Sequence, residues 1–594
     1  MTKRARRLAL FPLILAPTLC HAQAGRAELL GVIRDPSNLP VSSARVGAED
    51  QATMVRYSAL SDERGEYHIL GLPAGQYVLT VQKPGFRTYR QSGMVLRLAG
   101  QTSLDVTLEV GQPSESIDVT AAAPLLQTTS GELGLNVDQE KISGLPLDGR
   151  NFIPLVTLSP GVALPNGQFL PRINGSRPRT NEYLYDGISV LQPEPGQVVY
   201  YPIVDGMEEF KLNVNAYPPE YGRSNGGTVM VIGKSGSNQF HGDAFEFLRN
   251  EALNARNLFA QPGPKPEFRR NQYGVTFGGP IQSNKTFFFV DWQGTRLRTG
   301  ITRFSVVPTS AQRQGIFTQA IFDPTTSPRT QFANNTIPQN RIDSIALQVF
   351  EHYPLPNVSG ANNFVRTANE PDNQDQADFR VDRYFGEKHR VFGRYTLFRD
   401  DDNPVTPLPD GSGSLTSGVV GHALTRGDAF MGDYNLMLSP SALNQLRVGY
   451  SRRDLKQTSL QNGGINVPGL PANSFASVLP IFTVAGYQQI GPTAAANSRF
   501  TTSITEYLDT LTLVRRRHTI KFGLDIRREA LDVSQSAQSH GVFRLHYNRN
   551  QQPDCRRKRQ PTRLSPVGAG QCIQHLHSTK SDTAACPYCR NLLC

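Results

Sequence analysis

Alternation of polar and apolar residues through the second half of the chain constrains the fold more than any other feature. In the clearest run, the apolar residues Ile520, Phe522, Leu524 and Ile526 alternate with Thr519, Lys521, Asp525 and Arg527. Similar runs surround Trp292, Phe379 and Val448. A period of two indicates strands with one charged and one bulky apolar face, as in a transmembrane barrel with lipid outside and a polar lumen inside. A soluble antiparallel sheet with one wet face would show the same alternation in any single strand.

The connections between these strands separate the two alternatives. Residues 309–376, 400–424 and 458–502 form long segments that are rich in Asn, Pro and Gly. Such segments are awkward in a compact soluble domain but normal for the extracellular loops of a barrel. We therefore expect a mainly β chain in which residues 239–550 form a partial transmembrane antiparallel β-barrel.

The N-terminus predicts a secretory signal peptide over residues 1–24. Four basic residues precede an apolar run over residues 8–19, and Ala22 and Ala24 provide the small residues of a cleavage site. Leu19 stands before Cys20, where a lipoprotein signal needs a small residue, so we expect cleavage rather than lipidation. No later stretch reaches the roughly 18 uninterrupted apolar residues of a membrane helix. The exported chain is therefore predicted to be soluble or a β-barrel.

The formal net charge of +11 suggests a nucleic-acid partner until the charges are located. The excess of Lys and Arg lies in residues 1–22 and 553–594, and the body of the chain is nearly neutral. Nucleic-acid binding requires a basic patch on the folded body. We therefore exclude a nucleic-acid partner.

Residues 28–110 have the pattern of a β-sandwich. Tyr77, Leu79 and Val81 share one face at a period of two, and turn residues bound the apolar runs. The segment resembles the carboxypeptidase regulatory-like domain, a transthyretin-like β-sandwich grouped with carbohydrate-binding-like folds. We expect Tyr67, Tyr77 and Phe86 to be core residues. A sugar stacked on one of these rings is the alternative.

Within residues 111–238, the stretch 145–187 contains short apolar runs cut by Gly, Pro, Asn and Asp, which predict small strands and tight turns in a compact α+β or β domain. The order of the motifs resembles the plug domain of TonB-dependent outer-membrane receptors, in the Oar-like branch that carries an N-terminal sandwich. Residues 252–259 and 391–395 likewise resemble the Oar-like barrel. The plug motif comprises Leu145, Pro146, Leu147, Gly149, Arg150, Asn151 and Phe152.

Two groups of plug residues carry further expectations. Arg150, Arg172 and Arg177 are predicted to latch the plug to the barrel by ion pairing, with contact to a ligand as the alternative. Four glycines are expected at tight turns or at positive φ, namely Gly149, Gly161, Gly175 and Gly187.

A short strand-forming segment lies between the sandwich and the plug motif, and we expect it to have no fixed partner in its own domain. It resembles the TonB box, the peptide that the periplasmic TonB protein captures by adding it to a sheet. Such strand addition draws affinity from main-chain hydrogen bonds and needs alternating side chains without an internal Pro. The segment is Ile117, Asp118, Val119, Thr120 and Ala121. An ordinary interdomain linker strand is the alternative.

The sequence shows no catalytic constellation. The His residues are scattered, and neither Gly-x-Ser-x-Gly nor His-Glu-x-x-His occurs. We therefore expect no enzymatic activity, no metal site and no cofactor. Asp378 and Asp382 are expected to line the lumen rather than to act as an acid/base pair.

Residues 551–594 break with the strand pattern and hold five of the six cysteines: Cys555, Cys572, Cys586, Cys589 and Cys594. A redox dithiol or a zinc site would explain the spacing, but the βαβ setting of a redox site is missing. We expect an aberrant, disordered tail from a shifted reading frame. About eleven strand candidates precede it, against roughly 22 in barrels of this class. A C-terminally truncated chain that cannot transport is therefore expected, with closure by several chains as the alternative.

The resemblance implies a TonB-dependent receptor for energised uptake of a large solute, with a saccharide as one candidate. Its partners would be TonB, outer-membrane lipid and an unknown extracellular ligand. The barrel would lie in a Gram-negative outer membrane, with the sandwich and the TonB box in the periplasm. The alternative function is that of a secreted or surface β-protein that binds carbohydrate or another cell.

Overall fold

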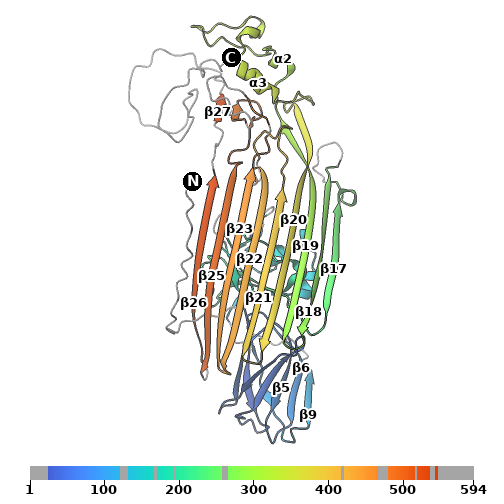
Figure 1. The fold of residues 1–594 in the computed structure, drawn as a ribbon, viewed down its shortest axis with the longest axis vertical. Helices are drawn as coiled ribbons and strands as arrows, with labels where there is room; N and C mark the ends of the chain where they lie inside the picture. The colour runs from blue at the N-terminus through green and yellow to red at the C-terminus, as the bar shows by residue number, and fades with distance from the viewer. Residues whose placement is uncertain are drawn as a thin grey trace, which may run out of the picture.

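The computed structural model describes residues 25–120, 131–165, 170–192, 196–256, 265–415, 420–461, 463–465, 479–515, 518–535 and 542–545. The predicted signal peptide, Ala121 and the cysteine-rich tail lie outside these residues. The fold is mainly β, as predicted, with a sandwich at one end, a tall sheet in the middle and a group of connecting segments at the other end (Figure 1).

The sandwich is built from the first nine strands. One of its sheets has the order β4-β1-β7 with β8 also paired to β1, and the other has the order β3-β2-β5-β6-β9. The strands are β1 (Ala27–Arg34), β2 (Arg45–Asp50), β3 (Arg56–Leu60), β4 (Glu66–Leu72), β5 (Gly75–Gln82), β6 (Thr88–Leu96), β7 (Gln101–Ser103), β8 (Val106–Thr107) and β9 (Ser116–Thr120).

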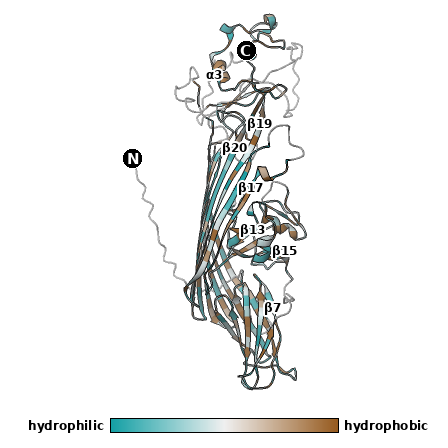
Figure 2. Cartoon of the chain, turned by 90° about the vertical axis from the view of Figure 1, so that its right-hand side faces the viewer, coloured by the Kyte–Doolittle hydropathy of each residue, from teal (hydrophilic) through white to brown (hydrophobic). Residues whose placement is uncertain are grey.

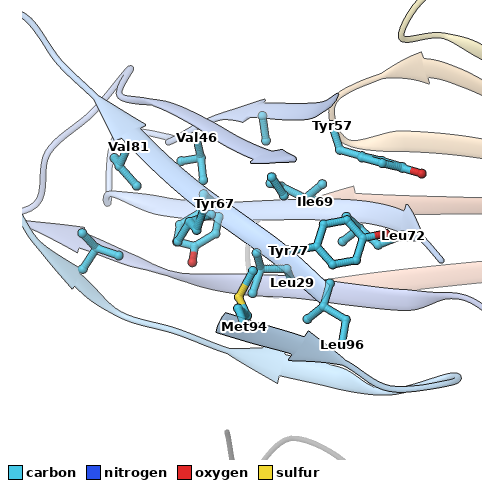
Figure 3. Close-up of a cluster of buried hydrophobic side chains, with 14 of the residues drawn as sticks. Leu29, Val46, Tyr57, Tyr67, Ile69, Leu72, Tyr77, Val81, Met94 and Leu96 are labelled. Carbon is cyan, nitrogen blue, oxygen red and sulfur yellow. The ribbon is translucent and has the colours of Figure 1, made fainter. Parts of the chain in front are cut away.

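Alternate side chains of the sandwich strands meet between its two sheets (Figure 3). Tyr77, Leu79 and Val81 of β5 are fully buried, as their shared face predicts. Tyr67 is also buried, and Phe86 packs against the same cluster. These aromatic residues are therefore core residues, and burial of each apolar side chain contributes about 1.5–3 kcal/mol to folding.

The plug, defined here as the described part of residues 131–233, contains one five-stranded sheet with the order β10-β15-β16-β13-β14. The four motif glycines take positive φ, as expected: Gly149 71°, Gly161 80°, Gly175 76° and Gly187 88°. Its elements are β10 (Leu133–Asp138), α1 (Gln139–Gly144), η1 (Asp148–Arg150), η2 (Ile153–Leu158), β11 (Val162–Ala163), β12 (Arg172–Ile173), β13 (Glu182–Tyr185), β14 (Ile188–Ser189), η3 (Val204–Gly206), β15 (Met207–Asn215) and β16 (Thr228–Gly233).

The wall, as we call the nine-stranded sheet, runs in the order β17-β18-β19-β20-β21-β22-β23-β25-β26 with every neighbouring pair antiparallel. Between residues 239 and 550 the described chain has eleven strands, and β24 and β27 stand outside this sheet. The wall strands are β17 (His241–Asn250), β18 (Phe268–Gln282), β19 (Thr286–Ser305), β20 (Phe364–Phe385), β21 (His389–Asp402), β22 (His422–Ser439), β23 (Ala442–Thr458), β25 (Ser498–Arg515) and β26 (His518–Gln535).

The wall turns its apolar face outward and its charged face inward, as the alternation predicts. On β20, Phe379 and Val381 are exposed, whereas Asp378, Arg380 and Asp382 are buried. A soluble sheet buries its apolar face instead. The observed polarity is that of a barrel wall surrounded by lipid.

The long connections gather at the end of the wall opposite the sandwich (Figure 1). They share an apolar cluster that includes Val307, Ile345, Leu408 and Phe482. The first connection is shorter than predicted, because residues 364–376 extend β20 along β19 despite their polar composition. The elements here are η4 (Glu251–Leu253), α2 (Ser310–Arg313), η5 (Ala333–Asn335), η6 (Gln339–Arg341), α3 (Ser344–Glu351), β24 (Ile481–Val484) and β27 (Val542–Leu545).

Among the described residues, no helix has the length and apolar character needed to cross a bilayer.

The outward face of the wall yields a test of its surroundings. Val381 on the wall and Val95 on the sandwich are similarly exposed, at 46% and 42%. We expect Val381→Arg to cost about 2–4 kcal/mol because it places a charge in lipid, and Val95→Arg to cost within about 0.5 kcal/mol because water covers that surface. The measurement is the folded fraction of each variant recovered in lipid vesicles. Equal recovery of the two variants would contradict a lipid-facing wall.

Candidate functional site

The plug lies against the polar face of the wall (Figure 2). Ile188 of β14 packs on Phe392 and Met431 of the wall. A Cβ atom at Gly449 would lie 2.3 Å from Ile188, so the glycine permits this close approach. The interface between plug and wall is therefore the first candidate site, because it brings together side chains from two separate parts of the chain.

Asp186 is the central ion-pairing residue of this interface. It occupies an Asp-Gly turn between β13 and β14, with φ of 48° and 88° at Asp186 and Gly187, as a two-residue hairpin requires. Its carboxylate lies 2.5 Å from Arg394 and 3.5 Å from Arg380. The Arg394 guanidinium also stacks 3.2 Å from the centre of the Tyr185 ring. All three charged side chains are buried.

A second group of contacts joins the plug to β25 and β26. The Glu182 carboxylate lies 3.4 Å from Arg527, and the Ser189 backbone N–H donates to Glu506 at 3.0 Å. Arg223 pairs with Glu529 at 2.6 Å. Removing one partner of a buried ion pair leaves an uncompensated charge. These pairs therefore fix the register of the plug on the wall.

The plug motif contacts the other side of the wall. Asp148 pairs with Arg270 at 2.5 Å and with Arg249 at 3.0 Å. The backbone C=O of Gly149 accepts a hydrogen bond from Gln272 at 3.1 Å. Asp148 was not among the predicted motif residues, although an acidic residue inside a Leu-Asp-Gly-Arg turn is a visible signal.

Arg150 contacts the wall through aromatic rings rather than through a wall carboxylate. Its guanidinium lies 4.4 Å from the ring centres of both Phe245 and Phe247, and its ion-pair partner, Asp205, belongs to the plug. Arg172 and Arg177 are exposed. Arg150 therefore contacts the wall, but through two aromatic rings and not through the ion pair with the barrel that was predicted.

The remaining motif residues are structural. Asn151 accepts a hydrogen bond from the Ile153 N–H at 3.0 Å. Phe152 is buried against Phe210, and Leu147 packs on the same core. Leu145 is 37% exposed, and Pro146 is exposed.

Asp378 and Asp382 lie on the inner, charged face of the wall, where lumen-lining residues are expected, and Asp382 is among the residues that line a cavity. Both are buried: Asp382 pairs with Arg380 at 2.9 Å, and Thr396 donates to Asp378. Asp382 and Arg380 thus pair within β20, and Asp378 accepts a hydrogen bond from Thr396 of the adjacent strand β21, so each buried carboxylate has a partner within the wall.

The TonB-box segment has a fixed partner, so the expectation of an unpaired strand is wrong. Strand β9 runs parallel to β6, with Ile117, Asp118 and Val119 opposite Tyr89, Arg90 and Gln91. The Thr88 N–H donates to Glu115 O, and its hydroxyl donates to Pro113 O, both at 2.8 Å. These anchors begin the pairing from the preceding turn, which alternation alone does not reveal.

The sandwich closes the adjacent end of the wall. Arg390 of β21 stacks 3.6 Å from the centre of the Tyr57 ring, and Lys521 of β26 lies 3.3 Å from Glu28. Phe287 of β19 is part of the sandwich core. A cavity of about 740 Å³ lies where sandwich, plug and wall meet, with Asp50, Glu208 and Arg380 among its lining residues.

Glu209 of β15 joins the plug to the sandwich beside this cavity. Burial raises its pKa to about 7, although the Leu98 N–H donates to it at 2.7 Å and Asn136 at 3.1 Å. The contact between plug and sandwich therefore contains a carboxyl group that titrates near neutral pH.

The chain is similar in sequence to two protein families and to a known protein. The chain matches the family model described as outer membrane beta barrel domain over residues 232–567, and that of the carboxypeptidase regulatory-like domain over residues 28–109. It is 29% identical over 308 residues to the TonB-dependent transporter Oar of Myxococcus xanthus. The matched region covers 49% of this chain and 29% of that protein. The chain thus spans less than a third of the length of this curated relative.

The fold is also similar to that of solved structures. One is the outer membrane transporter YddB from Escherichia coli, which is 15% identical to this chain with a TM-score of 0.41; the match covers 68% of this chain and 54% of that one. The siderophore receptor PirA from Pseudomonas aeruginosa has 11% identity, a TM-score of 0.33 and coverage of 68% and 60%.

A buried and an exposed ion pair between plug and wall should contribute differently to the free energy of unfolding. The Asp186 side chain is 3% exposed and that of Asp148 is 73% exposed. We expect Asp186→Asn to destabilise the folded chain by about 3–5 kcal/mol, because Arg394 is left without its counter-ion. The matched control, Asp148→Asn, should cost about 0–1 kcal/mol. Urea unfolding in detergent measures the free energy of unfolding of both variants. An equal decrease in the two variants would contradict the larger contribution expected of the Asp186 ion pair.

Titration of Glu209 should make stability depend on pH. Because its pKa rises from 4.5 to about 7 on folding, the folded state retains a proton that the unfolded state releases. Its stabilising contribution is present at acid pH and is lost as the pH rises through about 7. We expect an unfolding free energy that falls by on the order of 3 kcal/mol between pH 4 and pH 8 from this group. Glu209→Gln should remove that change and the exposed control Glu140→Gln should keep it; the reverse result would refute the assignment.

Proposed function

The chain belongs to the outer membrane beta barrel domain family, and we propose that it supplies the sandwich, the plug and part of the barrel wall for TonB-dependent uptake of a large solute across the outer membrane. Among the described residues its nine-stranded wall is an open sheet, so we infer that this chain does not transport on its own. The observation that carries the proposal is a plug seated by buried ion pairs on the charged inner face of a wall whose outer face is apolar. A plug held in this way blocks the lumen, and its polar contacts can be exchanged for water when it moves.

The family places this protein in a Gram-negative outer membrane. The name of the Myxococcus xanthus relative, a TonB-dependent transporter, supports energised transport as the activity. In this proposal TonB binds the segment beginning at Ile117 and pulls on it from the periplasm. Ligand binding by the loop end and the plug opens the path, and no covalent bond is made or broken.

The proposed ligand is a large solute, and a saccharide remains one candidate. Tyr67 and Tyr77 of the sandwich are buried in its core, so they offer no stacking surface for a sugar. A sugar would instead contact the segments at the opposite end of the wall or the exposed plug residues Arg172 and Arg177.

The test of the proposal uses Val119 on β9. Val119→Pro removes a backbone N–H and disrupts an extended strand, so we expect it to abolish binding of the purified periplasmic domain of TonB to the full chain in detergent. Val119→Thr keeps the N–H and a β-branched side chain and should bind as the unchanged protein does. Unaltered binding by the proline variant would exclude this segment as the TonB contact.

A further inference from the structure

Strand β9 is held in the sandwich on one side only. It pairs with β6 over Ser116–Thr120 and ends the sheet order β3-β2-β5-β6-β9. In the part of the chain that the structure describes, no strand pairs with the other edge of β9. Ser116, Asp118 and Val119 are exposed. Strand β9, which contains the TonB-box segment, therefore presents a row of backbone donors and acceptors at its outer edge while it stays paired with β6.

Several contacts resist release of β9. Besides the two hydrogen bonds from Thr88, Arg87 pairs with Glu115 at 2.6 Å and with Glu109 at 3.2 Å. The Gly111 N–H donates to Gly85 O at 3.1 Å. A partner that required free β9 would bind only the released fraction of the protein, and its apparent affinity would fall by that fraction. A partner that adds to the free edge avoids this loss.

The sandwich that holds β9 is also attached to the wall and the plug. Arg390 donates to Gly71 O at 3.3 Å, and Ser58 donates to Glu387 at 3.0 Å. On the plug side, Arg97 pairs with Asp138 at 2.9 Å. A force applied to docked β9 therefore reaches the contacts that close the end of the wall.

We propose that β9 stays in the sandwich sheet when TonB binds, and that a strand of the periplasmic domain of TonB adds to the outer edge of β9. The sandwich then receives the pulling force, and its displacement from the wall precedes movement of the plug. This inference rests on the proposed function, because it assigns the geometry of that same contact. Strand addition to an exposed sheet edge supplies affinity through main-chain hydrogen bonds.

A disulfide that locks β9 to β6 tests the inference. Arg90 and Asp118 are exposed and lie opposite each other on adjacent strands, a separation that a disulfide can span. The locked variant is Arg90→Cys with Asp118→Cys, in the full chain with its native cysteines replaced by serine. The matched control, Thr80→Cys with Arg90→Cys, joins β5 to β6 and leaves β9 untouched.

We expect the oxidised locked variant to bind the periplasmic domain of TonB within about twofold of its reduced form, as the control does. A loss of about tenfold or more on oxidation of the locked variant alone, restored by reductant, would show that β9 must be released and would overturn the inference while leaving the proposed function intact. Absence of binding in every variant, including the unsubstituted chain, would overturn both.

A second variant keeps the test decisive if the locked protein folds poorly. Arg87→Ala removes the ion pairs with Glu115 and Glu109 and loosens the start of β9. Our inference expects no gain in affinity for TonB, whereas a gain of about tenfold would indicate binding to released β9 and overturn it. A dimer of the chain that forms without TonB and is lost in Val119→Pro would assign the edge to a second copy, which also overturns it.

Discussion

The charged inner face of the wall requires counter-ions, and the rest of the structure depends on this requirement. Arg380, Arg394 and Arg527 project inward because period-two alternation places apolar side chains toward lipid. An unpaired buried guanidinium is strongly unfavourable. The wall itself provides Asp382 for Arg380 and Glu506 for Arg527. The plug adds Asp186, which pairs with Arg394 and Arg380, and Glu182, which pairs with Arg527. The same contacts that satisfy the wall therefore hold the plug in the lumen.

Local patterns in the sequence predicted which face of each wall strand is apolar and where the tight turns of the plug lie. Alternation around Phe379 and Val381 identified the lipid side, because the period of a strand is a property of neighbouring residues. The Asp-Gly turn of the plug was visible for the same reason. The partner of Asp186 was not visible, since Arg394 lies 208 residues further along the chain. The docking of β9 was missed because it depends on hydrogen bonds from Thr88 that the strand itself does not encode.

Three kinds of contact hold the molecule together, and they differ in how readily they can be undone. The sandwich core is apolar and closely packed around Tyr77 and Leu79. The interface between plug and wall combines buried ion pairs, such as that of Asp186 with Arg394, with an apolar contact of Ile188 on Phe392 and Met431. The contact between sandwich and plug includes Glu209, whose pKa lies near neutrality. Ionic and titratable groups can be hydrated when they separate, whereas exposing the apolar core of the sandwich would unfold it.

The direction of the chain gives the ion pairs a temporal order. Glu182 and Asp186 lie in the plug, which precedes every strand of the wall. Arg394 follows its partner Asp186 by 208 residues, and Arg527 follows its partner Glu182 by 345 residues. As the polypeptide is synthesised and exported from its N-terminus, the carboxylates arrive before the guanidinium groups that they neutralise. The plug therefore already carries the counter-ions of Arg394 on β21 and Arg527 on β26 when those strands are synthesised.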